Sequence, residues 1–260
     1  MKRFNLIGDI VAEGDKWIYD YLEMPSVTHG DVSKFLEDAN GEDIEIFIDS
    51  PGGLVNVGSD IYGELRAYKG KSTSYILGQA ASAASVAMMG ANKVIAIPTA
   101  SVIIHNTQLS ASGDYRDMES AADFLKEANE SIINAYEVKT SMKRADLQAL
   151  MDKTTRMSAQ TALDYGFIDE IALKDGEKLS AIENYIGSPD IMERLGNRSF
   201  NALKIHEMAG KIKNVIEEPE KEEITTEPAP NESGGESGPV SDKLSKQKSS
   251  FNEIRKKLYS

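Results

Sequence analysis

Short apolar runs alternate with segments of helical periodicity through the first 175 residues. Between two of these runs, Val57, Ile61 and Leu65 recur every four residues after the sequence SPGG, which predicts a helix. A second helical segment, made of small residues, extends from Ser82 to Met89. Strands alternating with helices are typical of an α/β domain. The runs that predict strands are 44–49, 73–78, 93–98 and 101–106.

A long amphipathic segment from about Asp114 to Lys143 predicts a third helix. It is longer than a mean helix, so we expect it to project and to contact another subunit. Its apolar residues gather on one side: Met118, Ala121, Phe124, Leu125, Ala128, Ile132 and Ile133.

Three different segments follow the first 173 residues. Residues 174–216 contain two helical pieces and look like an accessory region. Residues 217–250 are rich in Glu, Pro, Ser and Gly, a composition that cannot repay the entropy of ordering and predicts a disordered acidic linker. Residues 251–260 place three apolar residues at helical spacing beside basic ones. This short basic tail either docks on a partner or is a frayed, solvated end.

The net charge of −13 is unevenly distributed. Residues 217–237 alone contain eight Glu and one Lys, and the remaining chain is only mildly acidic. This distribution argues against nucleic-acid binding by the core. The N-terminus has no apolar core of signal-peptide length, and no apolar run approaches about 20 residues. We therefore expect a soluble cytoplasmic protein with no membrane partner.

The chain has no cysteine, which excludes a disulfide, a thiolate nucleophile and a Cys-ligated metal. The histidines are His29, His105 and His206, and the sequence shows neither a metal-ligand cluster nor a phosphate-binding loop. We therefore expect no cofactor and no metal. The candidate chemistry reduces to a hydroxyl nucleophile near a histidine.

The segment LGQAASAASVAMMG leads from an apolar strand into tiny residues that open a helix. A serine there is exposed at a sharp turn, lies near unpaired N–H groups of the helix start, and has no bulky neighbours. Ser82 and Ser85 both meet these conditions. The same residues also suit a closely packed helix face without catalytic function.

Two other segments suggest parts of a catalytic site. The Pro-Gly-Gly sequence after the strand at 44–49 leaves backbone N–H groups accessible where an oxyanion could lie, although an ordinary strand-to-helix turn explains it too. His105 ends the apolar run SVIIH, where a histidine is either a general base or a satisfied buried side chain.

Four motifs in this order resemble those of the Clp protease proteolytic subunit family: IDSPGG, GQAAS, a strand ending in IH, and RMSAQTALDYGFIDEI. The chain is more closely similar to phage relatives, the Clp-related head maturation proteases. The resemblance covers roughly residues 4 to 173 and implies a serine peptidase domain over residues 1–173. It implies an α/β fold of the Clp/crotonase type, a ββα spiral that assembles into homo-oligomeric rings with the long helix at the ring interface.

The resemblance also implies the roles of individual residues. The serine of GQAAS, here Ser82, is the nucleophile, and the histidine that closes the later strand, here His105, is the general base. The second glycine of SPGG and the residue after the nucleophile supply the oxyanion-hole N–H groups, which implies Gly53 and Ala83. Ser85 is then a helix residue.

The chain departs from the family at the third member of the triad. The family has an acidic residue four positions before the Ser or Thr of its "SA" segment, and this chain has Thr154 there. The nearest carboxylate is Asp152, two residues earlier. Either Asp152 moves into place, or Thr154 supports a weaker site, because a threonine stabilises an imidazolium less than a carboxylate does. Loss of activity is the third alternative.

We therefore expect a serine endopeptidase that matures a phage prohead, cutting capsid or scaffold proteins and also itself, within assembling proheads in the host cytoplasm. Confinement in the prohead would supply substrate at high local concentration, so an ATPase partner is allowed but not required. One alternative is a cytosolic Clp-type protease fed by an ATPase. Another is a non-catalytic capsid assembly or scaffold protein. A crotonase-type acyl-CoA enzyme is disfavoured by the Ser82 and His105 pair.

Overall fold

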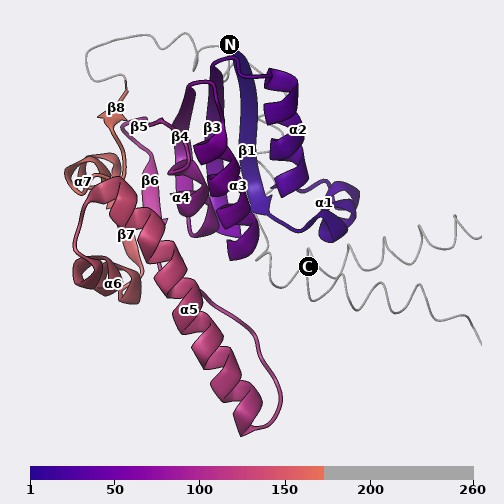
Figure 1. Ribbon diagram of the computed structural model, residues 1–260, viewed down its shortest axis with the longest axis vertical. Helices are drawn as coiled ribbons and strands as arrows, with labels where there is room; N and C mark the ends of the chain where they lie inside the picture. Colours follow the sequence, from indigo (N-terminus) through magenta and orange to yellow (C-terminus); the bar gives the residue numbers. More distant parts are fainter. Residues whose placement is uncertain (173–260) are drawn as a thin grey trace, which may run out of the picture. The chain divides into compact units, whose positions relative to one another are not determined.

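The computed structural model describes residues 1–172, which form an α/β domain around one sheet (Figure 1). The strands are β1 (Lys2–Ile10), β2 (Ser26–Val27), β3 (Ile44–Gly53), β4 (Ser72–Ala81), β5 (Lys93–Ala96), β6 (Ser101–Ile104), β7 (Thr155–Ser158) and β8 (Glu170–Ile171). The helices are α1 (Lys16–Tyr21), α2 (His29–Ala39), α3 (Val55–Ala67), α4 (Ala83–Met88), α5 (Tyr115–Thr140), α6 (Arg144–Asp152) and α7 (Ala159–Asp164), with a 3-10 turn at Glu13–Asp15.

The sheet has the order β2-β1-β3-β4-β5-β8, and the pairs along this path are parallel. Strand β4 changes partner along its length: Thr73 to Ile76 pair with β5, and Gln79 to Ala81 pair with β6. Strand β7 then adds antiparallel to β6. The carboxyl ends of β3, β4 and β6 therefore meet at one edge of the sheet, where ligands bind in open α/β sheets.

The main core lies between the sheet and the helices that cover one face of it (Figure 1). Ile61 and Leu65 of α3 face this core, and α4 is buried along its whole length. The C-terminal half of α5 adds Ile133 and Tyr136, which are almost completely buried. Burial of apolar area on this scale is the main stabilising term of the fold. The helices that carry the site are thus held by the central core.

The strands and helices predicted within residues 1–172 are confirmed, with different ends. Strand β3 continues through the SPGG sequence to Gly53, and β4 continues to Ala81, so both are longer than the apolar runs that predicted them. The first strand, β1, was not predicted, because charged and polar residues near its start interrupt the apolar pattern. The long helix ends at Thr140 and not Lys143, because Ser141 adopts a left-handed backbone conformation.

The N-terminal half of α5 projects away from the rest of the domain, as the sequence predicts (Figure 1). Of its predicted apolar side, Ile132 and Ile133 are buried, whereas Met118 and Phe124 remain 39% and 57% exposed. None of the helices within residues 1–172 is both long and apolar enough to cross a membrane. The predicted segments 174–216, 217–250 and 251–260 lie outside the described residues.

Candidate active site

Ser82 lies at the sharp turn between β4 and α4, with φ 53° and ψ −125°. A non-glycine residue with this backbone conformation is strained, at a cost of about 1–3 kcal/mol, and such residues concentrate at functional sites. Its main-chain groups are engaged: the N–H donates to the Ile103 carbonyl at 2.9 Å, and the carbonyl accepts from the Ser85 N–H at 2.9 Å. The half-buried side chain has no hydrogen bond within residues 1–172. The turn therefore presents Oγ at the end of the strand.

The glycine turn of SPGG packs directly against the Ser82 turn. A Cβ atom on Gly52 would lie 2.5 Å from the Ala81 carbonyl oxygen and 2.7 Å from Ser82 Cβ, and a Cβ on Gly53 would lie 2.1 Å from the Ile10 carbonyl oxygen. Both glycines also have positive φ, at 97° and 147°. Only glycine allows this close approach in this conformation.

Ser50 fixes this glycine turn, although nothing in the sequence singled it out. It is completely buried, and its Oγ donates to the Gly8 carbonyl at 2.6 Å and accepts from the Gly52 N–H at 3.1 Å. The Leu54 N–H donates to the Ile10 carbonyl at 2.9 Å. The amides on both sides of Gly53 are thus engaged within the turn, which leaves the Gly53 N–H as the donor to consider for a bound oxyanion.

Ala83 is the first residue of α4, so its N–H has no acceptor within that helix. Its amide nitrogen would lie 2.9 Å from a Cβ on Gly52, which shows how closely the two turns approach. The candidate donors Gly53 and Ala83 thus come from two turns that pack against each other beside Ser82.

Ser85 is completely buried inside α4, and its Oγ donates to the Ser82 carbonyl at 2.6 Å. The same oxygen lies 2.7 Å from the hydroxyl of Tyr136 on α5. Ser85 therefore supports the turn from behind. Burial raises the pKa of Tyr136, so its hydroxyl stays protonated and remains available as a donor.

His105 follows β6 directly and lies beside the Ser82 turn. Ile103 pairs with Ala81 across the parallel β4–β6 ladder, so the next residues of both strands extend past the same edge. The imidazole is half-buried, and its Nδ1 lies 2.7 Å from the carbonyl oxygen of Asn106. A carbonyl only accepts, so Nδ1 carries the proton and the lone pair is on Nε2. Within residues 1–172, Ser82 Oγ and His105 share no hydrogen bond, a looseness that is common without bound substrate.

The two candidates for the third triad member lie close to His105 in different ways. Ile104 pairs with Thr155 across the antiparallel β6–β7 ladder, so the register brings Thr154 level with His105. Thr154 is exposed, has a φ of 51°, and donates its N–H to the Met151 carbonyl at 3.0 Å. Asp152 is exposed at the end of α6. Neither side chain bonds to the imidazole.

Asp152 contacts the residue next to the histidine. Its Oδ1 accepts from Asn106 Nδ2 at 2.8 Å and from Gln148 Nε2 at 2.7 Å. The hydrogen bond from Asn106 first, and then that from Gln148, hold the pKa of Asp152 below its usual range. Asn106 could not be predicted from the sequence, because its contribution comes from a contact with a helix more than 40 residues later in the chain.

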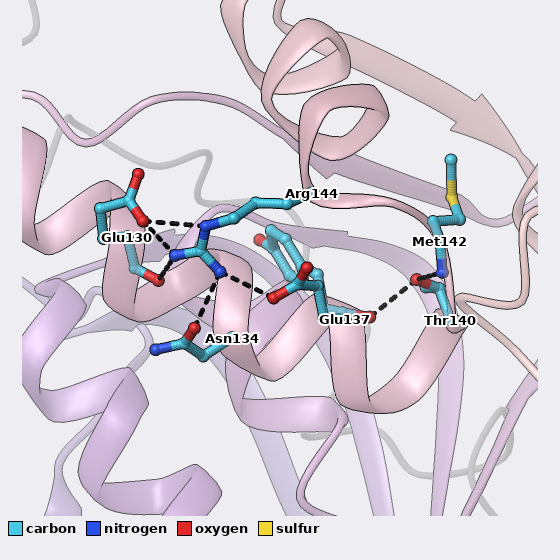
Figure 2. A network of polar contacts seen from close by, with 7 residues as sticks. Glu130, Asn134, Glu137, Thr140, Met142 and Arg144 are labelled. Carbon is cyan, nitrogen blue, oxygen red and sulfur yellow. Dashed lines mark hydrogen bonds and ion pairs between the residues drawn. The ribbon is translucent and has the colours of Figure 1, made fainter.

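Helix α6 is fixed to α5 by Arg144, whose guanidinium binds three side chains of the long helix (Figure 2). Nε donates to Glu130 Oε2 at 2.9 Å, and Nη1 donates to Asn134 Oδ1 at 2.9 Å and to Glu137 Oε2 at 2.7 Å. Bidentate and multiple contacts of this kind define an orientation as well as a distance. Arg144 thus sets where α6 begins, and Asp152 lies at its other end.

Among residues 1–172, no group of three or more His, Asp or Glu side chains is placed to hold a metal ion. His29 lies on α2, with its Nε2 3.0 Å from Glu64 Oε1. His206 lies outside the described residues. The arrangement around Ser82, His105 and the two turns can perform acyl-transfer chemistry with side chains and backbone amides.

Comparison with known proteins points to one family. The family model described as Clp protease matches residues 33–175. Two relatives are ATP-dependent Clp protease proteolytic subunits of Dehalococcoides mccartyi, one from strain BAV1 and one from strain CBDB1. Each is 30% identical over 139 residues, which is 53% of this chain and 70% of the relative.

Proposed function

Because the chain belongs to the Clp protease family, and this membership supports a serine-peptidase function, we propose that it is an endopeptidase with Ser82 as nucleophile and His105 as general base. One observation carries the assignment of these residues. Ser82 occupies a strained strand-to-helix turn, packed against the glycine turn and beside a histidine with its lone pair on Nε2.

In the proposed reaction, His105 Nε2 takes the proton from Ser82 Oγ as the oxygen attacks the peptide carbonyl carbon. The N–H groups of Gly53 and Ala83 donate to the oxyanion that forms. The intermediate collapses when His105 returns the proton to the leaving amine, and an acyl-enzyme remains on Ser82. Water, deprotonated by His105, then attacks the acyl carbon and releases the second product.

We further propose that the substrates are capsid or scaffold proteins of a phage prohead, with self-cleavage in addition, inside assembling proheads in the host cytoplasm. The support is a feature of the sequence: the family match stops at residue 175, and the acidic segment 217–237 lies beyond it. We also propose that the chain assembles into rings through α5, whose projecting half exposes Met118 and Phe124.

A second candidate is ATPase-fed degradation of unrelated proteins. The names of the two relatives favour it, since both are proteolytic subunits of ATP-dependent proteases. It requires a docked unfolding partner, whereas prohead maturation requires only that protease and capsid protein be enclosed together.

The test is to express the wild type and Ser82→Ala, each alone and each together with a phage capsid protein, and to compare the products by gel and intact mass. We expect only the wild type, and not Ser82→Ala, to trim itself or the capsid protein. A parallel reaction with a host Clp ATPase, ATP and an unfolded protein tests the second candidate. If wild type and Ser82→Ala give identical products in every arm, the catalytic proposal fails and a scaffold function replaces it.

A further inference from the structure

The residue after the general base is held in place by the end of α6. Asn106 Nδ2 donates to Asp152 Oδ1 at 2.8 Å, and Asn106 Oδ1 accepts from Gln148 Nε2 at 3.2 Å. Gln148 Nε2 also donates to Asp152 Oδ1 at 2.7 Å. The three side chains form a closed set of hydrogen bonds that satisfies both ends of the Asn106 amide.

This fixed residue contacts the imidazole through its main chain. The Asn106 carbonyl accepts from His105 Nδ1 at 2.7 Å, the contact that a triad carboxylate makes in other serine peptidases. A carbonyl on an unrestrained loop would rotate and lose this contact. The side-chain bonds to α6 restrain it, and Thr107 N–H is anchored as well, to Asn129 Oδ1 of α5 at 2.7 Å.

We propose that Asn106 is the positioning residue for His105: its carbonyl orients the imidazole, and Asp152 and Gln148 hold Asn106 in the orientation required. In this proposal, which rests on the proposed function, Asp152 acts on the histidine only through Asn106. Thr154, which is exposed and donates its backbone N–H to Met151, does not contribute. The missing triad carboxylate is thus replaced by a backbone carbonyl and a side-chain restraint.

This arrangement makes a prediction that separates it from a conventional triad. If Asp152 is needed only as a hydrogen-bond acceptor, Asp152→Asn keeps an oxygen for Asn106 and Gln148 and retains function, whereas Asp152→Ala does not. If Asp152 stabilises the imidazolium by its charge, both variants lose function equally, since the amide cannot replace the charge.

The experiment measures the rate at which a fluorophosphonate probe modifies Ser82 in the full-length protein, at one pH. This reaction needs the base but no knowledge of the substrate. The variants are Asn106→Ala, Asp152→Ala, Asp152→Asn and the double Asn106→Ala/Asp152→Ala. The matched control is Asp164→Ala, because Gln160 Nε2 donates to Asp164 Oδ1 at 2.8 Å in the same four-residue spacing, on another helix.

We expect Asn106→Ala and Asp152→Ala each to slow the maximal labelling rate about tenfold or more, without changing the probe concentration that gives half the maximal rate. The double variant should be labelled no more slowly than the slower of the two single variants, because both single substitutions break the same contact between Asn106 and Asp152. Asp152→Asn stays within about twofold of wild type, and Asp164→Ala matches it. Asp152 lies at an exposed helix end, so Asp152→Ala removes its hydrogen bonds to Asn106 and Gln148 without opening a cavity in the core.

Two results overturn the inference while the proposed function stands: wild-type labelling rates in Asn106→Ala, or equal losses in Asp152→Asn and Asp152→Ala. Labelling of Ser82 in the wild type at no more than the rate of the unfolded protein overturns the proposed function itself, and with it the inference. Thermal unfolding of every variant, with midpoints near that of wild type, assigns the losses to the site.

Discussion

Ser82 holds its strained conformation because a chain of buried hydroxyl groups supports it. Ser85 Oγ donates to the Ser82 carbonyl, and the Tyr136 hydroxyl bonds to Ser85, so a side chain from α5 reaches the turn through α4. Both supporting residues are almost completely buried. A strained turn persists only where the surrounding structure holds its conformation, and these linked hydroxyl groups provide that support behind Ser82.

Removing the Ser85 hydroxyl alone should therefore destabilise the protein more than removing the Ser85 and Tyr136 hydroxyls together. Ser85→Ala leaves the Tyr136 hydroxyl buried without its partner, and we expect the free energy of unfolding to fall by about 1–3 kcal/mol. Ser85→Ala/Tyr136→Phe removes the unpaired hydroxyl as well, and should recover part of this loss. Urea denaturation of both variants measures the difference. A double variant less stable than Ser85→Ala would show that the hydroxyl chain is not the support.

Asp9 gives the protein a pH-dependent stability. It is buried in β1 and accepts from the Tyr19 hydroxyl at 3.1 Å, and burial raises its pKa to about 7. Between about pH 4 and pH 7 the folded state therefore keeps a proton that the unfolded state has lost, so this group's contribution to stability falls as pH rises through that range.

We expect Asp9→Asn, which stays neutral and keeps an acceptor for Tyr19, to be more stable than wild type at pH 8, by on the order of 3 kcal/mol. The advantage should shrink towards pH 5. Urea denaturation of both proteins at pH 5 and pH 8 gives the two differences. A difference independent of pH would mean that Asp9 ionises normally in the folded protein.

At the level of single residues, the sequence indicated the chemistry but not its support. The tiny residues around Ser82 and the paired glycines are visible in the sequence because close packing demands small side chains there. Ser50, Asn106 and Tyr136 could not be found in this way. Each acts through a contact with a distant segment, and a polar residue in a strand or loop carries no sign of its partner.

Helices α5 and α6 together support the loop that carries His105, Asn106 and Thr107. Asn129 of α5 accepts a hydrogen bond from the Thr107 N–H, and Asp152 of α6 accepts one from the Asn106 side chain. Arg144 fixes the two helices to each other (Figure 2). The turn between them begins at Ser141 and is closed by Thr140, whose Oγ1 accepts from the Met142 N–H at 3.2 Å. The angle between the helices thus sets the position of Asn106.

We expect Arg144→Met to lower the thermal midpoint by about 2 °C, a small effect because the ion pairs are partly exposed. The difference from wild type should shrink in 1 M salt, since exposed charges are screened. Thermal scans of both proteins at low and high salt test this. A loss that is the same at both salt concentrations would assign the effect to packing of the arginine's aliphatic part.

At the scale of elements, periodicity predicted strands β3 to β6 and helices α3 to α5, whose apolar sides face one core, but not the strands and helices before β3 or after α5. The exceptions have physical reasons. β1 has charged and polar residues near its start and was not recognised, and β3 runs into SPGG because the register of the sheet continues past the apolar run. The break at Ser141 depends on a single left-handed residue, which periodicity cannot show.

Within residues 1–172, the projecting half of α5 is one of the places where large apolar side chains remain exposed. Tyr115, Met118 and Phe124 are 72%, 39% and 57% exposed. Exposed apolar side chains of this kind are typical of interfaces, and the proposed ring would cover them.

We expect Phe124→Glu to yield smaller assemblies than wild type, because a charge at the interface cannot be buried unpaired. Size-exclusion chromatography with light scattering measures the mass. Glu119→Gln, an exposed polar change on the same half of the helix, serves as the control. An unchanged mass for Phe124→Glu would place the ring interface elsewhere.

We propose that His105 activates Ser82, and mapping where a fluorophosphonate probe attaches tests this directly. We expect one adduct per chain, on Ser82, in the folded wild type, and none in Ser82→Ala. His105→Ala should react at least about 10³-fold more slowly, since removing the base leaves the serine hydroxyl unactivated. An adduct on another residue, or equal rates for wild type and His105→Ala, would show that His105 does not activate Ser82.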